Sequence, residues 1–318
     1  MKTCLITGAS GFVGRHLAAA LQQSPDPWLL RLVARDTDRL QDREGVTRHV
    51  VSTIDGNTEW PSLQGTDVVV HAAARVHVMQ DPASDVAWAQ YQRVNTDGTL
   101  RLAQRAADAG VQRFIFLSTI GVHGAGQERP YNESDNPVPN SPYAQSKLDA
   151  EIGLRSLAAH SGMEVVVIRP PLVYGPGAPG NFARLAAMVQ RGIPLPLGSV
   201  RNLRSLIAID NLVSFIQCCM THPAAANQTF LVSDGQDLST PDLISGMGAA
   251  LNRPVHLLPC PPTLLLWGMA CLGKKTMHRQ LTSTLRADIR KARTLLNWVP
   301  PIPVSTALIK ALSPHQPR

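Results

Sequence analysis

The chain has 318 residues, of which 44% are hydrophobic and 17% are charged, and it carries a formal net charge of +7. This composition is typical of a globular protein with one large domain, or with one large domain and a smaller appendage. No apolar run is long enough to span a bilayer, no signal peptide precedes the first glycines, and the five cysteines lack metal-ligand spacing, so we expect a cytoplasmic protein without a metal site. The basic residues are scattered along the chain, so the net charge is only a weak indication of an anionic ligand or a membrane surface.

A strand, a glycine-rich turn and a helix open the chain between residues 2 and 21. The apolar run that ends at Thr7 is followed by Gly8-Ala-Ser-Gly11-Phe-Val-Gly14 and then by an Ala/Leu-rich stretch. Gly8 permits a tight turn, Gly11 lets the backbone approach a pyrophosphate, and Gly14 lets the helix pack closely on the strand. The spacing is not the simplest dinucleotide fingerprint, and a plain turn is the alternative. Its position between a strand and a helix favours a dinucleotide-binding site.

Arg35 follows the second predicted strand, residues 29–34, where dinucleotide-binding folds contact the adenosine ribose. A carboxylate there would bind the 2′-hydroxyl group of NAD, whereas an arginine can pair with the 2′-phosphate group of NADP. Arg35, assisted by Arg15, therefore favours NADP(H) over NAD(H), which stays open. The alternative is an exposed arginine that stacks on the adenine ring.

The next two predicted strands also end at candidate ligand positions. Residues 67–71 form a buried strand that opens onto three alanines at 72–74, where the chain could pass close to a cofactor. A helix is predicted from residue 84 to residue 109. Residues 114–117 form the following strand, and Thr119 lies at its carboxyl end, where doubly wound sheets place ligands and catalytic groups.

A Tyr-x-x-x-Lys pair lies on the helix that begins after Ser141. Tyr143 and Lys147 are four residues apart and therefore share one helical face. The lysine ammonium group, with the positive charge of a nicotinamide nearby, would stabilise the phenolate and lower the pKa of the tyrosine. The pair alone is a weak signal, but its order after the glycine turn and Thr119 favours an acid/base role.

Residues 164–168 form a strand that closes the nucleotide-binding sheet, and the pattern is less regular after the Pro/Gly-rich loop at 169–177. Further helices are predicted near 181–191, 210–221 and 240–251, with a short strand at 229–232. We therefore predict an α/β protein with a Rossmann-type doubly wound parallel sheet in residues 1–170. Residues 171–318 would form a smaller α/β substrate-binding lobe, interleaved with the last sheet elements, and the active site would lie between the two.

Together these motifs resemble the extended short-chain dehydrogenase/reductase superfamily, in its NAD(P)-dependent nucleotide-sugar epimerase/dehydratase branch. The resemblance covers nearly the whole chain and includes His71-Ala-Ala-Ala, Arg169-Pro-Pro-Leu-Val-Tyr-Gly-Pro-Gly, Arg204-Ser-Leu-Ile-Ala-Ile-Asp and Lys291-Ala-Arg-Thr-Leu-Leu-Asn-Trp-Val-Pro. Segments 73–79 and 222–235 are similar to bacterial O-antigen enzymes catalogued as UDP-glucose 4-epimerase-like. Some of these are C4 reductases of UDP-4-keto-6-deoxy-N-acetylhexosamines.

The resemblance implies a role for each catalytic candidate. Thr119 would hydrogen-bond the sugar oxygen that becomes the carbonyl, Tyr143 would exchange the proton, and Lys147 would hold the nicotinamide ribose and lower the pKa of the tyrosine. The implied cofactor-binding residues are Gly8, Ser10, Gly11, Phe12, Val13, Gly14, Arg35, Ile54, Ala72, Ala73, Ala74, Asn95, Tyr143, Lys147 and Pro170.

The resemblance also implies a substrate site in the second half of the chain. Asn181 and Arg204 would contact the nucleotide diphosphate, together with Thr119 at the sugar, and Arg279 would be a second phosphate ligand. Two alternatives stay open: Thr119 could cap a strand, and Arg204 could form a structural ion pair.

Two places depart from the family pattern. Thr53 stands where relatives often carry an aspartate that binds adenine, with Asp55 nearby, so the adenine contacts are open. Gly121 and His123 follow Thr119 at positions where many relatives carry bulkier or different polar groups, so the shape of the sugar pocket is open too.

The resemblance implies an oxidoreductase that acts at C4 of a UDP-sugar, reducing a UDP-4-keto-6-deoxy-N-acetylhexosamine for surface polysaccharide (O-antigen, lipopolysaccharide) synthesis. A UDP-glucose or UDP-N-acetylglucosamine 4-epimerase is the alternative, because both reactions use Thr119, Tyr143 and Lys147. A non-catalytic nucleotide sensor or RNA-binding protein is disfavoured by this intact set and by the lack of RNA-binding motifs. We expect a UDP-sugar and no nucleic acid as partner; relatives are often homodimers, which the sequence leaves open.

Overall fold

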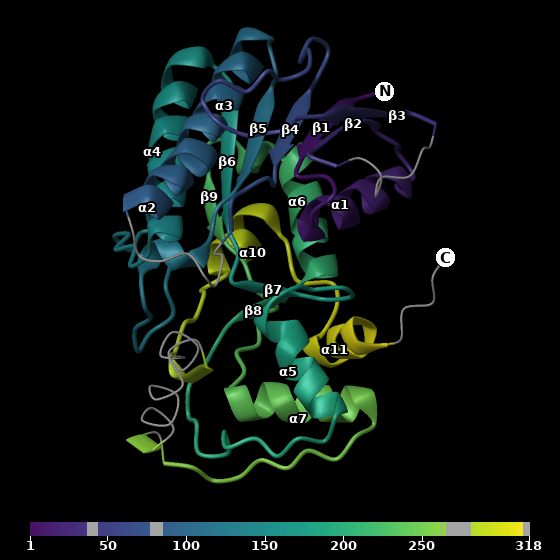
Figure 1. Ribbon diagram of the computed structural model, residues 1–318. Coiled ribbons are helices and arrows are strands. Elements are labelled where there is room, and N and C mark those ends of the chain that lie inside the picture. The colour runs from purple at the N-terminus through teal and green to yellow at the C-terminus, as the bar shows by residue number, and fades with distance from the viewer. Residues whose placement is uncertain (37–43, 77–84, 262, 265–280, 314–318) are drawn as a thin grey trace.

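A computed structural model describes the chain except residues 37–43, 77–84, 262, 265–280 and 314–318. A seven-stranded parallel sheet forms the larger domain, with the strand order β3-β2-β1-β4-β5-β6-β9 (Figure 1). The strands are β1 (Thr3–Thr7), β2 (Leu29–Ala34), β3 (Val46–Val50), β4 (Val68–His71), β5 (Arg113–Leu117), β6 (Glu164–Arg169) and β9 (Thr229–Leu231). The order reverses between β1 and β4, which confirms the Rossmann-type doubly wound sheet.

The central strands are buried along their whole length because helices cover both faces of the sheet. Every residue of β1, β4 and β5 is buried. One face packs against α1 (Phe12–Gln22) and α6 (Ile209–Thr221), and the other packs against α3 (Gly98–Asp108) and α4 (Pro142–Ser161) (Figure 1). The sheet edge at the carboxyl ends of the strands is therefore held rigidly from both sides.

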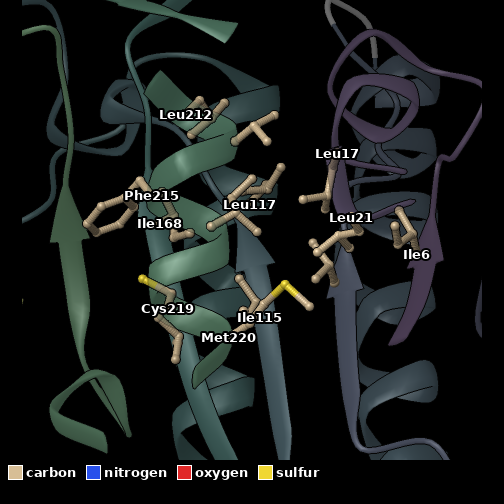
Figure 2. Close-up of a cluster of buried hydrophobic side chains, with 14 of the residues drawn as sticks. Ile6, Leu17, Leu21, Ile115, Leu117, Ile168, Leu212, Phe215, Cys219 and Met220 are labelled. Atoms are coloured by element: carbon tan, nitrogen blue, oxygen red, sulfur yellow. The ribbon is translucent and has the colours of Figure 1, made fainter. Parts of the chain in front are cut away.

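The face covered by α6 shows how the two halves of the chain share one core. Figure 2 shows Leu212, Phe215, Cys219 and Met220 of α6 gathered beside Ile115, Leu117 and Ile168 of the sheet. The ring of Phe215 also meets Trp298, near the end of the chain, with 4.9 Å between ring centroids. The C-terminal segment is thus anchored to the sheet domain by apolar burial.

The helix predicted from 84 to 109 is interrupted in the structure. α2 (Asp85–Tyr91) is followed by a π-helical segment, Gln92–Asp97, which continues into α3. A π-helical turn inserts an extra residue and so rotates the face that follows. This rotation buries Asn95 completely, and the side chain lies between the chain after β4 and the helix that carries Tyr143.

The smaller lobe has its own apolar cluster. It contains the paired strands β7 (Leu172–Tyr174) and β8 (Leu206–Ala208) and the helices α5 (Asn181–Gln190), α7 (Thr240–Leu251) and α11 (Val304–Leu312), while α10 (Arg290–Leu296) packs against β9. The expectation that residues 164–168 close the sheet is wrong, because β9 pairs with β6 beyond them. The boundary at residue 170 stays a prediction, since α6 and β9 follow it and complete the sheet domain.

No helix in the described part of the chain is both long and apolar enough to cross a bilayer. The described residues also contain no group of three or more His, Cys, Asp or Glu side chains that could hold a metal ion. The four described cysteines are free thiols.

Candidate active site

The glycine turn has the close backbone contacts that its sequence predicts. Gly8 has φ = +66°, and a Cβ atom there would lie 2.8 Å from the backbone nitrogen of Ala73. A Cβ atom at Gly14 would lie 2.2 Å from the carbonyl oxygen of Gly8, so only glycine fits this helix–strand contact. No side chain caps the N-terminus of α1 at Gly11. The first N–H groups of α1 are therefore available to an anion, which fits a dinucleotide pyrophosphate.

Other predicted cofactor residues lie along the same carboxyl edge of the sheet. Arg35 is exposed directly after β2, and the alanines at 72–74 follow β4. The predicted set also includes Ser10, Phe12 and Val13 at the start of α1, Ile54 against Gly98, and Pro170 after β6. The guanidinium group of Arg15 donates to the carbonyl oxygen of Gly177 (3.1 Å) on the loop after β7, and its assistance to Arg35 stays a prediction.

A buried histidine links the glycine turn to the π-helical segment. Thr99 donates to the carbonyl oxygen of Asn95 (2.7 Å), so its hydroxyl oxygen accepts from Nε2 of His71 (2.9 Å). Nδ1 of His71 then accepts from the hydroxyl group of Thr7 (2.7 Å), whose oxygen accepts from the backbone N–H of Ala73 (3.2 Å). Burial lowers the pKa of His71 to about 3, so the ring is neutral and this direction of the hydrogen bonds is fixed.

Asn95 has a structural role that its prediction as a cofactor contact did not include. Its amide group accepts from the backbone N–H of Arg75 (2.8 Å) and donates to the carbonyl oxygen of the same residue (3.1 Å). It also donates to the hydroxyl oxygen of Ser146 on α4 (3.0 Å). Asn95 therefore fixes the chain after β4 against the helix of Tyr143, and a cofactor contact stays a prediction.

The structure brings the three catalytic candidates to one place. Thr119 follows β5, and its hydroxyl oxygen accepts from the backbone N–H of Gly121 (3.1 Å), which leaves its own proton free to be donated. Gly121 lies between Thr119 and the first turn of α4. A Cβ atom on Gly121 would be 3.3 Å from the hydroxyl oxygen of Thr119 and 3.7 Å from Cβ of Ala144, the residue after Tyr143. Lys147, fully buried, donates to the carbonyl oxygen of Leu117 (2.8 Å) and so ties α4 to the end of β5.

The charge state of the Tyr143–Lys147 pair differs from the sequence expectation. Burial raises the pKa of Tyr143 to about 12, and the neighbouring Tyr91 adds to the effect. Burial lowers the pKa of Lys147 to about 7, although the carboxylate of Glu151 opposes this shift. At neutral pH the lysine is only partly charged, so it stabilises the phenolate weakly. The lowered tyrosine pKa that the spacing predicts therefore depends on the positive charge of an oxidised nicotinamide.

A buried charge network behind the catalytic strand end was missed by the sequence analysis. Glu151 is completely buried one helical turn after Lys147 and accepts from both Arg169 (Nε, 3.0 Å; Nη2, 2.5 Å) and Ser118 (2.5 Å). Arg169 also donates to Nε2 of His123 (2.9 Å). The network holds both ends of the segment that carries Thr119. A sequence signal existed, because Glu151 lies on the helical face of Lys147.

Asp55 lies close to Thr53, the position at which relatives often carry an aspartate that binds adenine. Its side chain is buried. One carboxylate oxygen accepts from the guanidinium group of Arg93 (2.5 Å and 3.0 Å), and the other accepts from the backbone N–H of Asn57 (2.9 Å). These hydrogen bonds hold the pKa of Asp55 below its usual range. Asp55 therefore holds its own turn together, and it does not replace the aspartate that is absent at Thr53.

Two of the three residues predicted to bind the phosphates lie in the described part of the lobe. Asn181 is the first residue of α5, and Arg204 is partly buried beside β8, where it donates to the carbonyl (3.1 Å) and hydroxyl (2.9 Å) oxygens of Ser283. No carboxylate among the described residues pairs with Arg204, so the ion-pair alternative has no support there. Arg279 lies outside the described residues. The roles of all three stay predictions.

Two surface hollows lie elsewhere. One of about 430 Å³ is lined by Arg129, Arg290 and Arg293, among others, and one of about 290 Å³ is lined by His123 and Tyr131. None of the catalytic candidates lines either hollow. The site is therefore defined by the convergence of strand ends and helix N-termini rather than by cavity volume.

The fold and site together define a class of protein, a Rossmann-fold oxidoreductase with a Tyr-x-x-x-Lys pair beside a strand-end threonine. A family model described as the NAD dependent epimerase/dehydratase family matches residues 4–233, and the chain belongs to this family of nucleotide-sugar enzymes. The "UDP-glucose 4-epimerase" of Vibrio cholerae is 43% identical over 94% of this chain and 91% of its own length. The "GDP-6-deoxy-D-mannose reductase" of Pseudomonas aeruginosa is 27% identical over 98% and 97%.

Solved structures show the same fold. The UDP-glucuronic acid 4-epimerase of Bacillus cereus, in a crystal structure in complex with NAD, is 23% identical and has a TM-score of 0.77. That comparison covers 98% of this chain and 97% of the other chain. At this identity the likeness supports the architecture, and the bound NAD is a property of the other protein.

Proposed function

We propose that this enzyme is an NAD(P)-dependent oxidoreductase that acts at C4 of a UDP-sugar. The observation that carries the proposal is the convergence of Thr119, Tyr143 and Lys147 at the carboxyl edge of the sheet that also holds the glycine turn. Hydride chemistry at a secondary alcohol or ketone needs a proton donor and acceptor at the oxygen, and this trio has the required groups.

Each of the three residues has a definable part in the reaction. The hydroxyl group of Thr119 donates to the C4 oxygen, because its own oxygen already accepts from Gly121. Tyr143 gives its proton to this oxygen in reduction and takes it back in oxidation. Lys147 holds the nicotinamide ribose and, when charged, favours the phenolate that forms. A bound dinucleotide supplies or accepts the hydride at C4.

The diphosphate of the substrate is proposed to bind in the lobe. Arg204 supports this assignment because its guanidinium group is partly buried and meets only neutral oxygens of Ser283. Burial lowers the pKa of Arg204, as expected for a cation that lacks a carboxylate partner. A phosphate group would supply the missing negative charge. Asn181 at the start of α5, and Arg279, are proposed as additional ligands.

The direction of the reaction is proposed to be reduction. Arg35 is exposed at the end of β2 and favours NADPH, which cells usually keep as their reducing pool. The substrate would then be a UDP-4-keto-6-deoxy-N-acetylhexosamine made for surface polysaccharide such as O-antigen. The likeness to a relative named as a GDP-6-deoxy-D-mannose reductase is in keeping with this direction.

A C4 epimerase is the second candidate, and one observation favours it. The relative named as a UDP-glucose 4-epimerase is more similar than the reductase, at 43% against 27% identity. An epimerase would return the hydride to the other face of the same ketone, so its coenzyme would stay bound through each cycle. The three catalytic residues would be the same.

One pair of assays separates the candidates. The purified enzyme is given a UDP-4-keto-6-deoxy-N-acetylhexosamine with NADPH, and in a second tube UDP-glucose or UDP-N-acetylglucosamine without added coenzyme. Stoichiometric loss of NADPH in the first tube supports the reductase. Interconversion of C4 epimers in the second tube, with NADPH unused in the first, would replace it with the epimerase. Tyr143→Phe should abolish either activity.

A further inference from the structure

The two halves of the chain differ strongly in charge, although the basic residues are spread along both. Residues 1–170 hold 16 Lys and Arg against 18 Asp and Glu, whereas residues 171–318 hold 14 against 5. The entire positive excess of the protein therefore belongs to the lobe half. An asymmetry of this kind indicates an anionic surface as partner more often than a single small ligand.

The few carboxylates of this half are all engaged in the structure. Asp210 pairs with Lys310, Asp234 accepts from Ala208 and Asn211, Asp237 pairs with Arg286, Asp242 completes the capping box of α7, and Asp288 pairs with Arg290. Two long segments, 165–209 and 243–287, contain no acidic residue at all. Three of the five carboxylates therefore neutralise Arg286, Arg290 and Lys310, and none of the five lies in the two acid-free segments.

Part of both segments forms one end of the molecule, which we call the lobe tip and define as residues 191–198 and 252–260. These two stretches follow α5 and α7 and run together at the end of the lobe farthest from the seven-stranded sheet (Figure 1). Backbone hydrogen bonds join them, from Leu195 to His256 (2.9 Å), from Leu258 to Leu195 (2.9 Å) and from Gly198 to Leu258 (3.0 Å). The tip is therefore an ordered surface.

The lobe tip combines exposed cations with exposed apolar side chains. Arg191 and Arg253 are exposed, while Ile193 and Leu258 keep 42% and 51% of their surface in contact with solvent. Four prolines add further apolar surface, at positions 194, 196, 254 and 259. Each arginine follows a helix C-terminus, where a cation is favourable on its own. The favourable charge at a helix C-terminus explains the arginines alone. It does not explain why Ile193 and Leu258 are exposed, or why the lobe tip contains no Asp or Glu.

We propose that the lobe tip docks on the surface of an anionic lipid bilayer. Arg191 and Arg253 would lie among the phosphate groups, and Ile193 and Leu258 would enter the boundary between headgroups and acyl chains. Nucleic acid is the competing anionic partner. It is less suitable, because the tip has no Phe, Tyr or Trp side chain and offers bases only the imidazole ring of His256 for stacking. Its exposed Leu, Ile and Pro side chains would also gain nothing from contact with phosphate groups. The proposal does not depend on which C4 reaction the enzyme performs.

Flotation of the full-length protein with vesicles tests the proposal. The vesicles contain phosphatidylcholine alone, or phosphatidylcholine with about 30% phosphatidylglycerol, at a salt concentration of about 0.1 M, where charges act over about 10 Å. We expect the wild type to float with the anionic vesicles and to lose this binding at about 1 M salt, where the range falls to about 3 Å. An arginine near an anionic surface contributes a factor of about five, so Arg191→Glu/Arg253→Glu should bind at least about 25-fold more weakly.

Two matched variants separate the tip from net charge and from folding. Lys2→Glu/Arg101→Glu makes the same change in net charge on the sheet domain and should bind the anionic vesicles like the wild type. Ile193→Ser/Leu258→Ser should weaken binding while leaving the charge unchanged. All variants should remain folded, because the altered side chains are exposed; Arg191→Glu/Arg253→Glu should raise the equilibrium constant of unfolding by only about two- to fivefold at each helix C-terminus. Equal binding to neutral and anionic vesicles, equal loss in the Lys2/Arg101 control, or binding to single-stranded RNA in place of vesicles would overturn the proposal.

Discussion

A phenol that is half-buried in the first turn of a helix keeps its proton, because the phenolate would lose its hydration. Tyr143 is in this position, and burial raises its pKa to about 12. Such a group is a poor base in the free chain but a suitable proton donor to a substrate oxygen. The catalytic assignment therefore depends on the hydroxyl group of Tyr143 alone, which a Phe substitution removes with little change in packing.

We expect Tyr143→Phe to lower turnover by about two to four orders of magnitude while cofactor binding is kept, since the general acid/base is lost and the ring remains. Steady-state rates and a coenzyme titration measure the two effects. Tyr131→Phe is the matched control, because the ring of Tyr131 stacks on His123 while none of the described contacts uses its hydroxyl group. Wild-type turnover in Tyr143→Phe would show that the catalytic assignment is wrong.

Arg35 decides the coenzyme in the proposed function. We expect the wild type to bind NADPH more tightly than NADH, and Arg35→Asp to reverse the preference by repelling the 2′-phosphate group. A charge-assisted hydrogen bond contributes about 1.5–3 kcal/mol, so the ratio of the two dissociation constants should shift by more than about tenfold. Arg101→Asp, at an exposed position of α3, should leave the ratio unchanged. Equal affinities of the wild type for the two coenzymes would contradict this assignment.

Burying the charged form of Lys147 lowers the free energy of unfolding, and the pKa of Lys147 predicts how this loss depends on pH. Burial lowers its pKa from 10.5 to about 7, so between these values the unfolded chain binds a proton that the folded chain does not. Stability therefore rises with pH across this range, by up to about 1.4 kcal/mol per pH unit. Relative to Lys147→Met, the wild type should gain stability between about pH 7 and pH 10. Denaturant unfolding measures this slope, and Lys310→Met, at a more exposed site, should not change it.

At the scale of elements, α4 is defined at both ends by local signals. Ser141 caps the helix by accepting from the backbone N–H of Ala144 (3.2 Å), Pro142 occupies the first turn, and Gly162 ends the helix with φ = +73°. These residue types favour helix ends for steric and hydrogen-bonding reasons, so the sequence places this helix well. The same cap fixes the turn that carries Tyr143.

Loss of the two comparable caps should have different consequences. Ser141→Ala and Ser239→Ala, the latter in the capping box of α7, should each cost about 1 kcal/mol of stability. Only Ser141→Ala should also reduce turnover, because the first turn of α4 holds Tyr143. Thermal unfolding and steady-state rates measure the two effects. Equal turnover in both variants would mean that the cap of α4 does not position the tyrosine.

What the sequence could not predict at this scale depends on long-range contacts. Strand and helix ends marked by glycine, proline or a cap were placed within a few residues. The π-helical segment at Gln92–Asp97 was not, because it preserves a helical pattern and shows only when Asn95 meets α4. The pairing of β9 with β6 was also missed, since it joins Arg169 to Leu231 across the whole lobe insertion. The catalytic trio was predicted from short motifs, but Glu151 acts through Arg169 and Ser118, which are distant in sequence.

At the scale of the whole molecule, two neutral histidines are built into the interior of the sheet domain. His71 lies between Thr7 and Thr99, and His123 accepts from Arg169 and stacks on Tyr131. Burial lowers their pKa values to about 3 and about 4, and the positive charge of Arg169 adds to the effect at His123. Neither histidine is charged at neutral pH, so each ring has one nitrogen that can accept a hydrogen bond, from Thr7 at His71 and from Arg169 at His123.

These histidines should make the protein sensitive to acid. From pH 6.5 downward the unfolded chain takes up protons that the folded chain excludes until about pH 4 and pH 3, so stability falls as pH falls. Glu133 and Asp234, whose pKa values burial raises, act in the opposite direction. The dependence of the wild-type unfolding free energy on pH therefore combines these opposing effects. A comparison with a histidine variant isolates the contribution of the histidine.

His123→Phe provides that comparison. Phe keeps a ring against Tyr131 but cannot accept from Arg169, so the variant should be less stable than the wild type at pH 7. The variant has no imidazole at this position, so its stability does not depend on the protonation of residue 123. The difference in unfolding free energy between wild type and variant should therefore shrink by up to about 1.4 kcal/mol for each pH unit from about 6.5 down to about 5. Denaturant unfolding at several pH values measures it, with His160→Phe at an exposed site as the control. A difference that stays constant over this range would mean that residue 123 is not held neutral by the buried network.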